Sequence, residues 1–149
     1  MSHHLLLILH IFAATIWVGG HTYLIFRVFP KVLRHKDTEG LLAFEKSYEP
    51  LGMSALVILV ITGAWMATQY GISLNDIFSF SGPIERVVSL KLLLLLCTIG
   101  VAISAQTRVI PTLRSSPAQL PSMAVHATAV TGLAIAMMAL GTFIRYGGL

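Results

Sequence analysis

The sequence predicts an all-α integral membrane protein, in which four helices run up and down across the bilayer as one bundle. Only 11% of the 149 residues are charged and 56% are hydrophobic, whereas about a quarter of the residues in soluble domains are charged. The mean hydropathy is +0.82. Long apolar runs without period-2 alternation favour helices over a barrel, because backbone polar groups in lipid must be bonded within the protein. A chain of this length is expected to form a single domain, residues 1–149.

The first expected span, residues 5–28, contains the clearest candidates for function. Its segment 5–26 has no Asp, Glu, Lys or Arg, and it is long enough to cross a hydrocarbon core of about 30 Å. His10 and His21 are eleven residues apart, which places them on one face of a helix and about 16 Å apart along its axis. Ionisable side chains in a membrane helix indicate a functional site that faces the bundle interior.

Three further spans follow the first one. Pro30 is expected to end the first span, and residues 31–49 to form a connector with a short amphipathic helix on the membrane surface. The capping residue of that helix is expected to be Asp37 or Thr38. The remaining spans are expected at 51–70, 87–107 and 123–144, with polar or proline-containing turns between them. No internal repeat is apparent. The N-terminus has neither the basic stretch nor the small-residue cleavage site of a signal peptide. We therefore expect the first span to be a retained helix.

The distribution of basic residues predicts the orientation of the bundle. The loops after the first and third spans hold seven of them, namely Arg27, Lys31, Arg34, Lys36, Lys46, Arg108 and Arg114. The opposite side holds Arg86, Lys91 and Arg145. The positive-inside rule then places both termini on the outer, periplasmic side of a bacterial inner membrane. The same placement argues against nucleic acid as a partner, although the isoelectric point is near 9.6.

An inner candidate site combines the first and fourth spans. In an up-down bundle these helices are antiparallel, so His126 is expected within about 5 Å of the depth of His21. Both imidazoles would then serve one cofactor, each with its second nitrogen donating to a hydroxyl or a backbone carbonyl. Alternatively, each histidine only bonds a neighbouring helix. Small residues near these positions would admit a flat ring or close helix packing; they are Gly19, Gly20, Thr22, Thr128, Ala129 and Gly132.

An outer candidate site surrounds His10. Lys91, Met66 and Met137 are expected at the same depth on the other three helices. Lys91 alternatively snorkels to the headgroups, and methionines are also common core filler. We expect Trp17 to pack in the core and Cys97 to be buried.

The amino-terminal residues offer a separate copper motif. In Met1-Ser2-His3, or in Ser2-His3-His4 after removal of Met1, a histidine is third from the free amine. An amine, two backbone nitrogens and this imidazole form the square-planar nitrogen set that suits Cu(II). A three-residue motif also arises by chance.

Several motifs together resemble a known family. They are HIFAATIWVGGH from residue 10, FEKSYEPLG from residue 44, KLLLLL from residue 91, and Ile110-Pro111 with His126 before and in the fourth span. The chain resembles a short member of the CopD (copper resistance D) family, which is similar to four-helix b-type cytochromes and HemJ-type protoporphyrinogen oxidases. The family name implies copper uptake or tolerance, and the wider set implies haem b held by histidines. HemJ-type proteins pair a first-helix histidine with a third-helix lysine, matching His10 and Lys91.

Three functions therefore compete. The first is a membrane cytochrome b, with one or two haems bound at His10, His21 and His126 and with Trp17, Gly20, Lys91 and Met137 beside them. It would be an oxidoreductase that transfers electrons to a quinone or another small redox substrate. The second is a copper-binding uptake protein that uses His3, His4, His10 and methionines. The third is a scaffold without a cofactor. The expected partners are membrane lipid and further copies of the chain.

Overall fold

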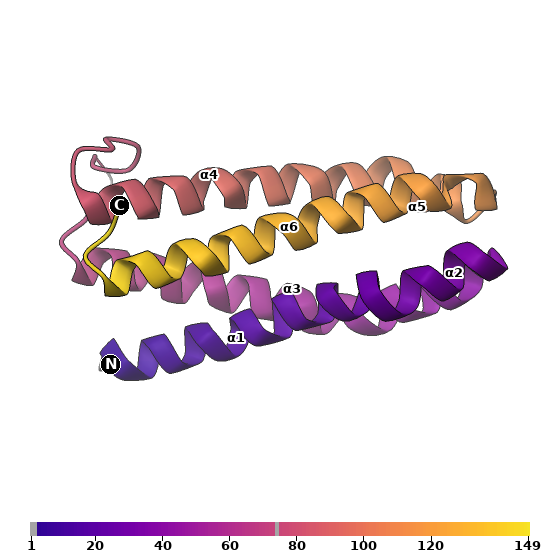
Figure 1. The fold of residues 1–149 in the computed structure, drawn as a ribbon, viewed down its shortest axis with the longest axis horizontal. Coiled ribbons are helices and arrows are strands. Elements are labelled where there is room, and N and C mark those ends of the chain that lie inside the picture. Colours follow the sequence, from indigo (N-terminus) through magenta and orange to yellow (C-terminus); the bar gives the residue numbers. More distant parts are fainter. Residues whose placement is uncertain (1–2, 74) are drawn as a thin grey trace.

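The computed structural model describes residues 3–73 and 75–149, and it confirms the all-α fold. Four long apolar helical rods are each long enough to cross a membrane, at His3–His35, Thr38–Gln69, Pro83–Leu113 and Pro117–Arg145. The described residues include no strand. The elements are α1 (His3–Tyr23), the π-helix η1 (Leu24–Val28), α2 (Phe29–His35), α3 (Thr38–Gln69), α4 (Pro83–Ser104), the π-helix η2 (Ala105–Val109), α5 (Ile110–Leu113), the 3-10 helix η3 (Pro117–Gln119) and α6 (Leu120–Arg145). Figure 1 shows the rods lying side by side, with both chain ends at the same end of the bundle.

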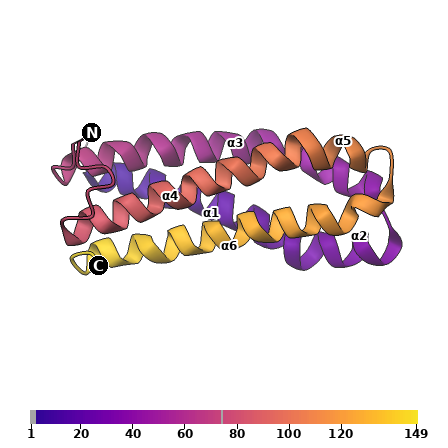
Figure 2. The same cartoon turned by 90° about the horizontal axis from the view of Figure 1, so that it is seen from above.

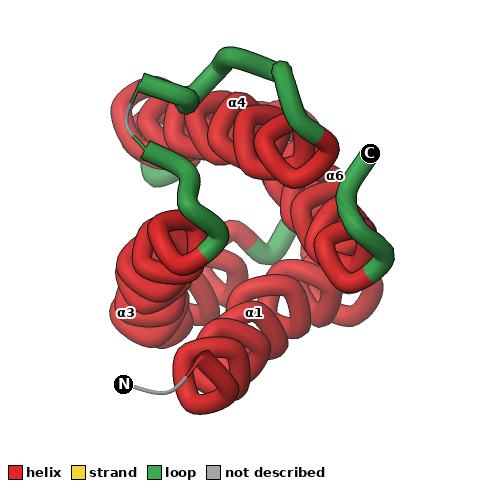
Figure 3. The backbone as a smooth tube through the Cα atoms, turned by 90° about the vertical axis from the view of Figure 1, so that its left-hand side faces the viewer, coloured by secondary structure: helices red, strands yellow, loops and turns green. Residues whose placement is uncertain are grey.

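The bundle consists of two antiparallel hairpins. The α1 rod packs closely along α3, and the α4 rod along α6 (Figure 2). The hairpins meet mainly through α1 and α6, whereas α3 and α4 make few close approaches within the described chain. In the end-on view, the four helices surround a common axis (Figure 3).

Two predicted boundaries are wrong for the same reason. Pro30 does not end the first rod, which continues to His35, and Pro50 lies inside α3. The predicted surface helix and second span are therefore one helix. A proline removes one helical hydrogen bond, but packing on both sides of it keeps the rod continuous, since Leu41 and Ala55 are both buried on the same face of α3. The predicted cap is confirmed, because the Asp37 carboxylate accepts from Gly40 N at 2.8 Å.

The two hairpins share an internal repeat that the sequence analysis missed. Residues 27–30 read Arg-Val-Phe-Pro, and residues 108–111, which lie 81 positions later, read Arg-Val-Ile-Pro. Each segment begins in the last two residues of a π-helix and continues into the following α-helix. In each, the residue before the proline donates its backbone N–H to the carbonyl five residues earlier, from Phe29 to Leu24 and from Ile110 to Ala105.

The same offset of 81 relates buried positions of α1 and α4. Leu6 and Val87 are both buried, as are Trp17 and Thr98. The repeat is thus preserved in backbone geometry and at some buried positions, while few residue identities survive. Ser89, for example, is buried, whereas its counterpart Ile8 is exposed. It also makes Lys91 the counterpart of His10.

The orientation of the bundle gives the first testable prediction. We expect reporter domains fused at Gly40 and at the carboxyl terminus to report opposite sides of the membrane, with Gly40 cytoplasmic, because the basic residues concentrate at the end that holds α2 and α5. An alkaline phosphatase and fluorescent protein pair measures this. The same side for both fusions would contradict four spans.

Candidate functional site

Three histidines form a stripe along α1 that faces α3. His3, His10 and His21 are seven and eleven residues apart, so they share one side of the helix. Each has a polar neighbour on α3: His3 Nδ1 lies 2.7 Å from Gln69 Oε1, His10 Nδ1 lies 2.8 Å from Thr62 Oγ1, and the His21 ring contacts Tyr48. This histidine stripe therefore runs through most of the span.

The proton position on His10 follows from its contact with Thr62. The single hydroxyl proton of Thr62 goes to the Ile58 carbonyl, at 2.6 Å. The hydroxyl oxygen must therefore accept from Nδ1 of His10, so in the neutral ring Nε2 carries the lone pair. Gly63 leaves room for this ring, since a Cβ there would lie 3.4 Å from Cε1. Nε2 is the nitrogen that can bind a metal ion.

His21 is held by its own helix and by α3. Its Nδ1 donates to the Trp17 carbonyl at 2.8 Å, and its ring centroid lies 4.4 Å from that of Trp17. The Tyr48 hydroxyl reaches the carbonyls of Ile16 and Trp17, each at 3.1 Å. The acceptor predicted for the second ring nitrogen is thus a backbone carbonyl and not the hydroxyl of Thr22. Nε2 again keeps the lone pair.

The flat ring beside Gly20 belongs to the protein itself. A Cβ at Gly20 would overlap the ring of Tyr48, which lies between α1 and α3. The space expected for a cofactor ring at Gly20 is therefore filled by Tyr48. The neighbouring Gly19, and Gly132 on α6, face open space on the exposed surface of the bundle.

His126 has the same local arrangement as His21. Its Nδ1 donates to the Ser122 carbonyl at 2.9 Å, four residues earlier, and its Nε2 accepts from the Ser104 hydroxyl at 3.1 Å. Beside it, a groove of about 260 Å³ opens between α4 and α6. The groove is lined by Gly100, Val101, Ser104, Val125, His126 and Ala129.

His21 and His126 are at similar depth but have separate surroundings. Leu24 packs in one cluster with Ala127, and Trp17 in another with Val130, which matches the expected depth. The recorded hydrogen bonds and ring contacts of His21 are with α1 and α3, and those of His126 are with α4 and α6. Within the described chain, no hydrogen bond or ring contact joins the two histidines.

Lys91 occupies on α4 the position that His10 occupies on α1. Its Nζ would lie 3.5 Å from a Cβ at Gly141 of α6, much as His10 lies over Gly63 of α3. It is half-buried, and it forms no ion pair within the described residues. The repeat therefore places one nitrogen-bearing side chain from each hairpin at equivalent positions, His10 and Lys91.

Other predicted residues have mixed outcomes. Trp17 is buried in the core, as expected, and its Nε1–H has no hydrogen-bond partner in the described part of the protein. Cys97 is exposed, contrary to expectation, because it faces away from the bundle. Met66 and Met137 are half-buried. Of the amino-terminal copper motif, Met1 and Ser2 lie outside the described residues.

The donor set limits the type of metal site. Among the described residues, no group of three or more His, Cys, Asp or Glu side chains lies close enough to hold a metal ion. Thioethers are outside that set of side chains, and they favour a soft ion such as Cu(I).

Comparison with known proteins gives one match. A family model described as copper resistance protein D matches residues 42–144, a range that includes Tyr48, Thr62, Lys91 and His126. The histidine stripe precedes the matched range. No curated protein and no solved structure gave a significant match. Because the match covers more than half of the sequence, the chain belongs to the copper resistance protein D family of membrane proteins.

Proposed function

We propose that this protein binds copper within its membrane bundle, as a step in copper uptake or tolerance. The observation that carries the proposal is the fixed His10 ring. Thr62 holds Nδ1 as the donor and leaves the Nε2 lone pair available inside the membrane. Family membership supports copper as the cargo.

The other donors at this depth suit Cu(I). Met66 and Met137 are half-buried on α3 and α6, and thioethers combined with imidazole select Cu(I) over harder ions. Lys91 opposes copper while it is charged and adds a nitrogen donor when it is neutral. Copper binding and the charge on Lys91 are therefore expected to compete.

Cellular copper tests this function. Cells that lack their own copper-handling membrane proteins would express wild type, His10→Ala or the matched variant His35→Ala, whose exposed ring lies outside the stripe. We expect wild type and His35→Ala to change the cellular copper content, measured by mass spectrometry, relative to the empty vector. The same two proteins should also change copper tolerance in growth assays. His10→Ala should match the empty vector at equal membrane abundance. Retained activity in His10→Ala would refute the proposed site.

A second candidate, haem b held by His21 and His126, rests on a different observation. Both rings donate Nδ1–H to the carbonyl four residues earlier, which is the orientation of a metal-ligating histidine. Nε2 of His126 accepts from the Ser104 hydroxyl, so this hydrogen bond would have to break before His126 could bind iron. Haem bound there would supply one-electron chemistry. Trp17, Val130 and Ala134 pack together where α1 meets α6, so this contact would have to open to admit a porphyrin. That requirement makes copper the better-supported function.

A further inference from the structure

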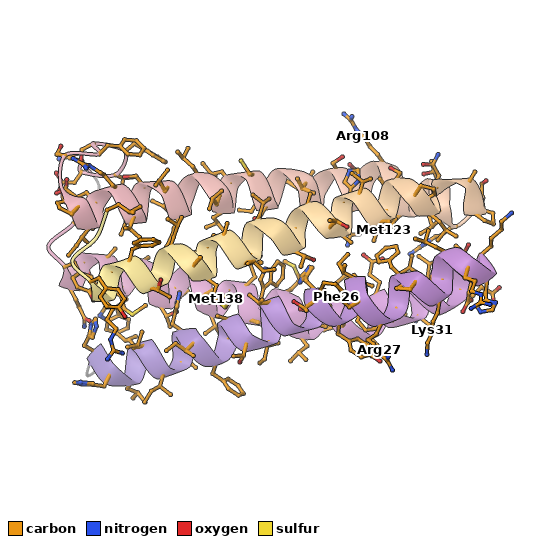
Figure 4. The ribbon with its side chains drawn as sticks, viewed as in Figure 1. Phe26, Arg27, Lys31, Arg108, Met123 and Met138 are labelled. Carbon is orange, nitrogen blue, oxygen red and sulfur yellow. The ribbon has the colours of Figure 1, made fainter. Side chains whose placement is uncertain are left out.

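The π-helices place two arginines at equivalent positions on the two hairpins. Arg27 is the fourth residue of η1, and Arg108 is the fourth residue of η2. Because α1 and α4 run in the same direction and share the repeat, the two arginines lie at the same depth in the bundle. Figure 4 shows Arg27 pointing away from the bundle on one side, together with Lys31, and Arg108 pointing away on the other side.

Neither arginine is neutralised by the protein. Both are exposed, and neither guanidinium forms a hydrogen bond or an ion pair in the part of the chain that the structure describes. Two of the acidic residues near this end are engaged elsewhere. The Asp37 carboxylate caps α3, and Glu49 accepts from Gln106 at 3.3 Å.

The surroundings of the arginines are typical of a membrane interface. Phe26, directly before Arg27, is 70% exposed, so an apolar and a charged side chain are exposed next to each other, as expected where a rod passes from hydrocarbon to headgroups. The two prolines mark the same level, because the backbone changes from π back to α bonding at the residue before each of them. A guanidinium at this depth is within reach of lipid phosphates, which it can bind through two parallel hydrogen bonds.

We propose that Arg27 and Arg108 bind the headgroup phosphates of anionic lipids, one on each side of the bundle. The repeated Arg-Val-x-Pro segment is then a duplicated lipid contact, since its π-helix holds each arginine at the interface. Two contacts on opposite sides fix both the depth and the tilt of the protein. This role is independent of copper.

Lipid titration of the purified full-length protein in mixed micelles tests the proposal. We expect phosphatidylglycerol to raise the thermal unfolding midpoint and phosphatidylcholine to have little effect. Arg27→Gln and Arg108→Gln should each weaken the apparent phosphatidylglycerol affinity about fivefold, and the double variant should lose most of the response. Arg145→Gln, at the other end of the bundle, is the matched control and should behave as wild type.

Three results would overturn the proposal. They are an unchanged response in the double variant, an equal loss in Arg145→Gln, and stabilisation of wild type by inorganic phosphate as large as that by phosphatidylglycerol. The last result would assign the arginines to free phosphate and not to lipid.

Discussion

Gly20→Ala is expected to lower the free energy of unfolding by about 2 kcal/mol relative to Gly19→Ala, because the new methyl group meets the ring of Tyr48. Both substitutions add the same helix propensity, so their difference isolates the clash. A Cβ at Gly19 has no neighbour within 4 Å. Detergent-solubilised protein unfolded by heat or denaturant and followed by circular dichroism gives the comparison.

The clash should also disturb His21. Tyr48 bonds the carbonyls of Ile16 and Trp17, and Trp17 in turn accepts from the His21 ring. In a double-mutant cycle with Tyr48→Ala, the effect of Gly20→Ala should shrink, because the overlapping ring is gone. Equal stabilities for the Gly19 and Gly20 variants would show that the Tyr48 ring does not pack against Gly20.

Thr62→Val is expected to weaken copper binding by roughly 10- to 100-fold without unfolding the bundle. The substitution keeps the shape of the side chain and removes the hydroxyl that accepts from His10 Nδ1. The ring is then free to turn or to change tautomer. A competition titration of Cu(I) against a coloured chelator measures the affinity of the purified protein.

Thr131→Val is the matched control for Thr62→Val. Thr131 is also buried, and its hydroxyl donates to the carbonyl four residues earlier at 2.7 Å, as that of Thr62 does at 2.6 Å. It does not bond a histidine. The control should retain the wild-type affinity, and an equal loss in both variants would mean that general packing, not the His10 ring, sets copper binding.

The sequence predicted the number and position of the helices because apolar length is a strong constraint in lipid. It did not predict their true lengths. Prolines are read as breaks in a sequence, but Pro30 and Pro50 lie in rods whose buried faces continue on both sides. The cap at Asp37 was predictable because it depends on adjacent residues only.

The site was predicted in part. Histidines in an apolar span stand out by their cost in lipid, but their partners Thr62 and Tyr48 do not, because hydroxyl side chains are common in membrane helices. The spacing of these residues in the second rod could have indicated which face of it contacts another helix. Tyr48, Ala55, Thr62 and Gln69 recur every seven residues, which is the spacing of a seam that faces another helix.

The repeat was missed because it preserves geometry more than identity. Only the short Arg-Val-x-Pro segment is visible in the sequence, and its two prolines were interpreted separately, Pro30 as a helix end and Pro111 as part of a turn. The equivalence of His10 and Lys91 became clear only when both π-helices and the contacts with Gly63 and Gly141 were in view. The proposed outer site therefore depends on tertiary structure, whereas its individual residues could be proposed from the sequence.

The most direct test of copper binding combines metal analysis and an absorption spectrum of the wild-type protein, purified from cells supplied with both copper and iron. We predict stoichiometric copper that is lost in His10→Ala, and no haem absorption bands in the reduced-minus-oxidised spectrum. Low-spin haem bands that disappear in His21→Ala or His126→Ala, in protein without copper, would contradict the copper proposal and establish the haem site instead.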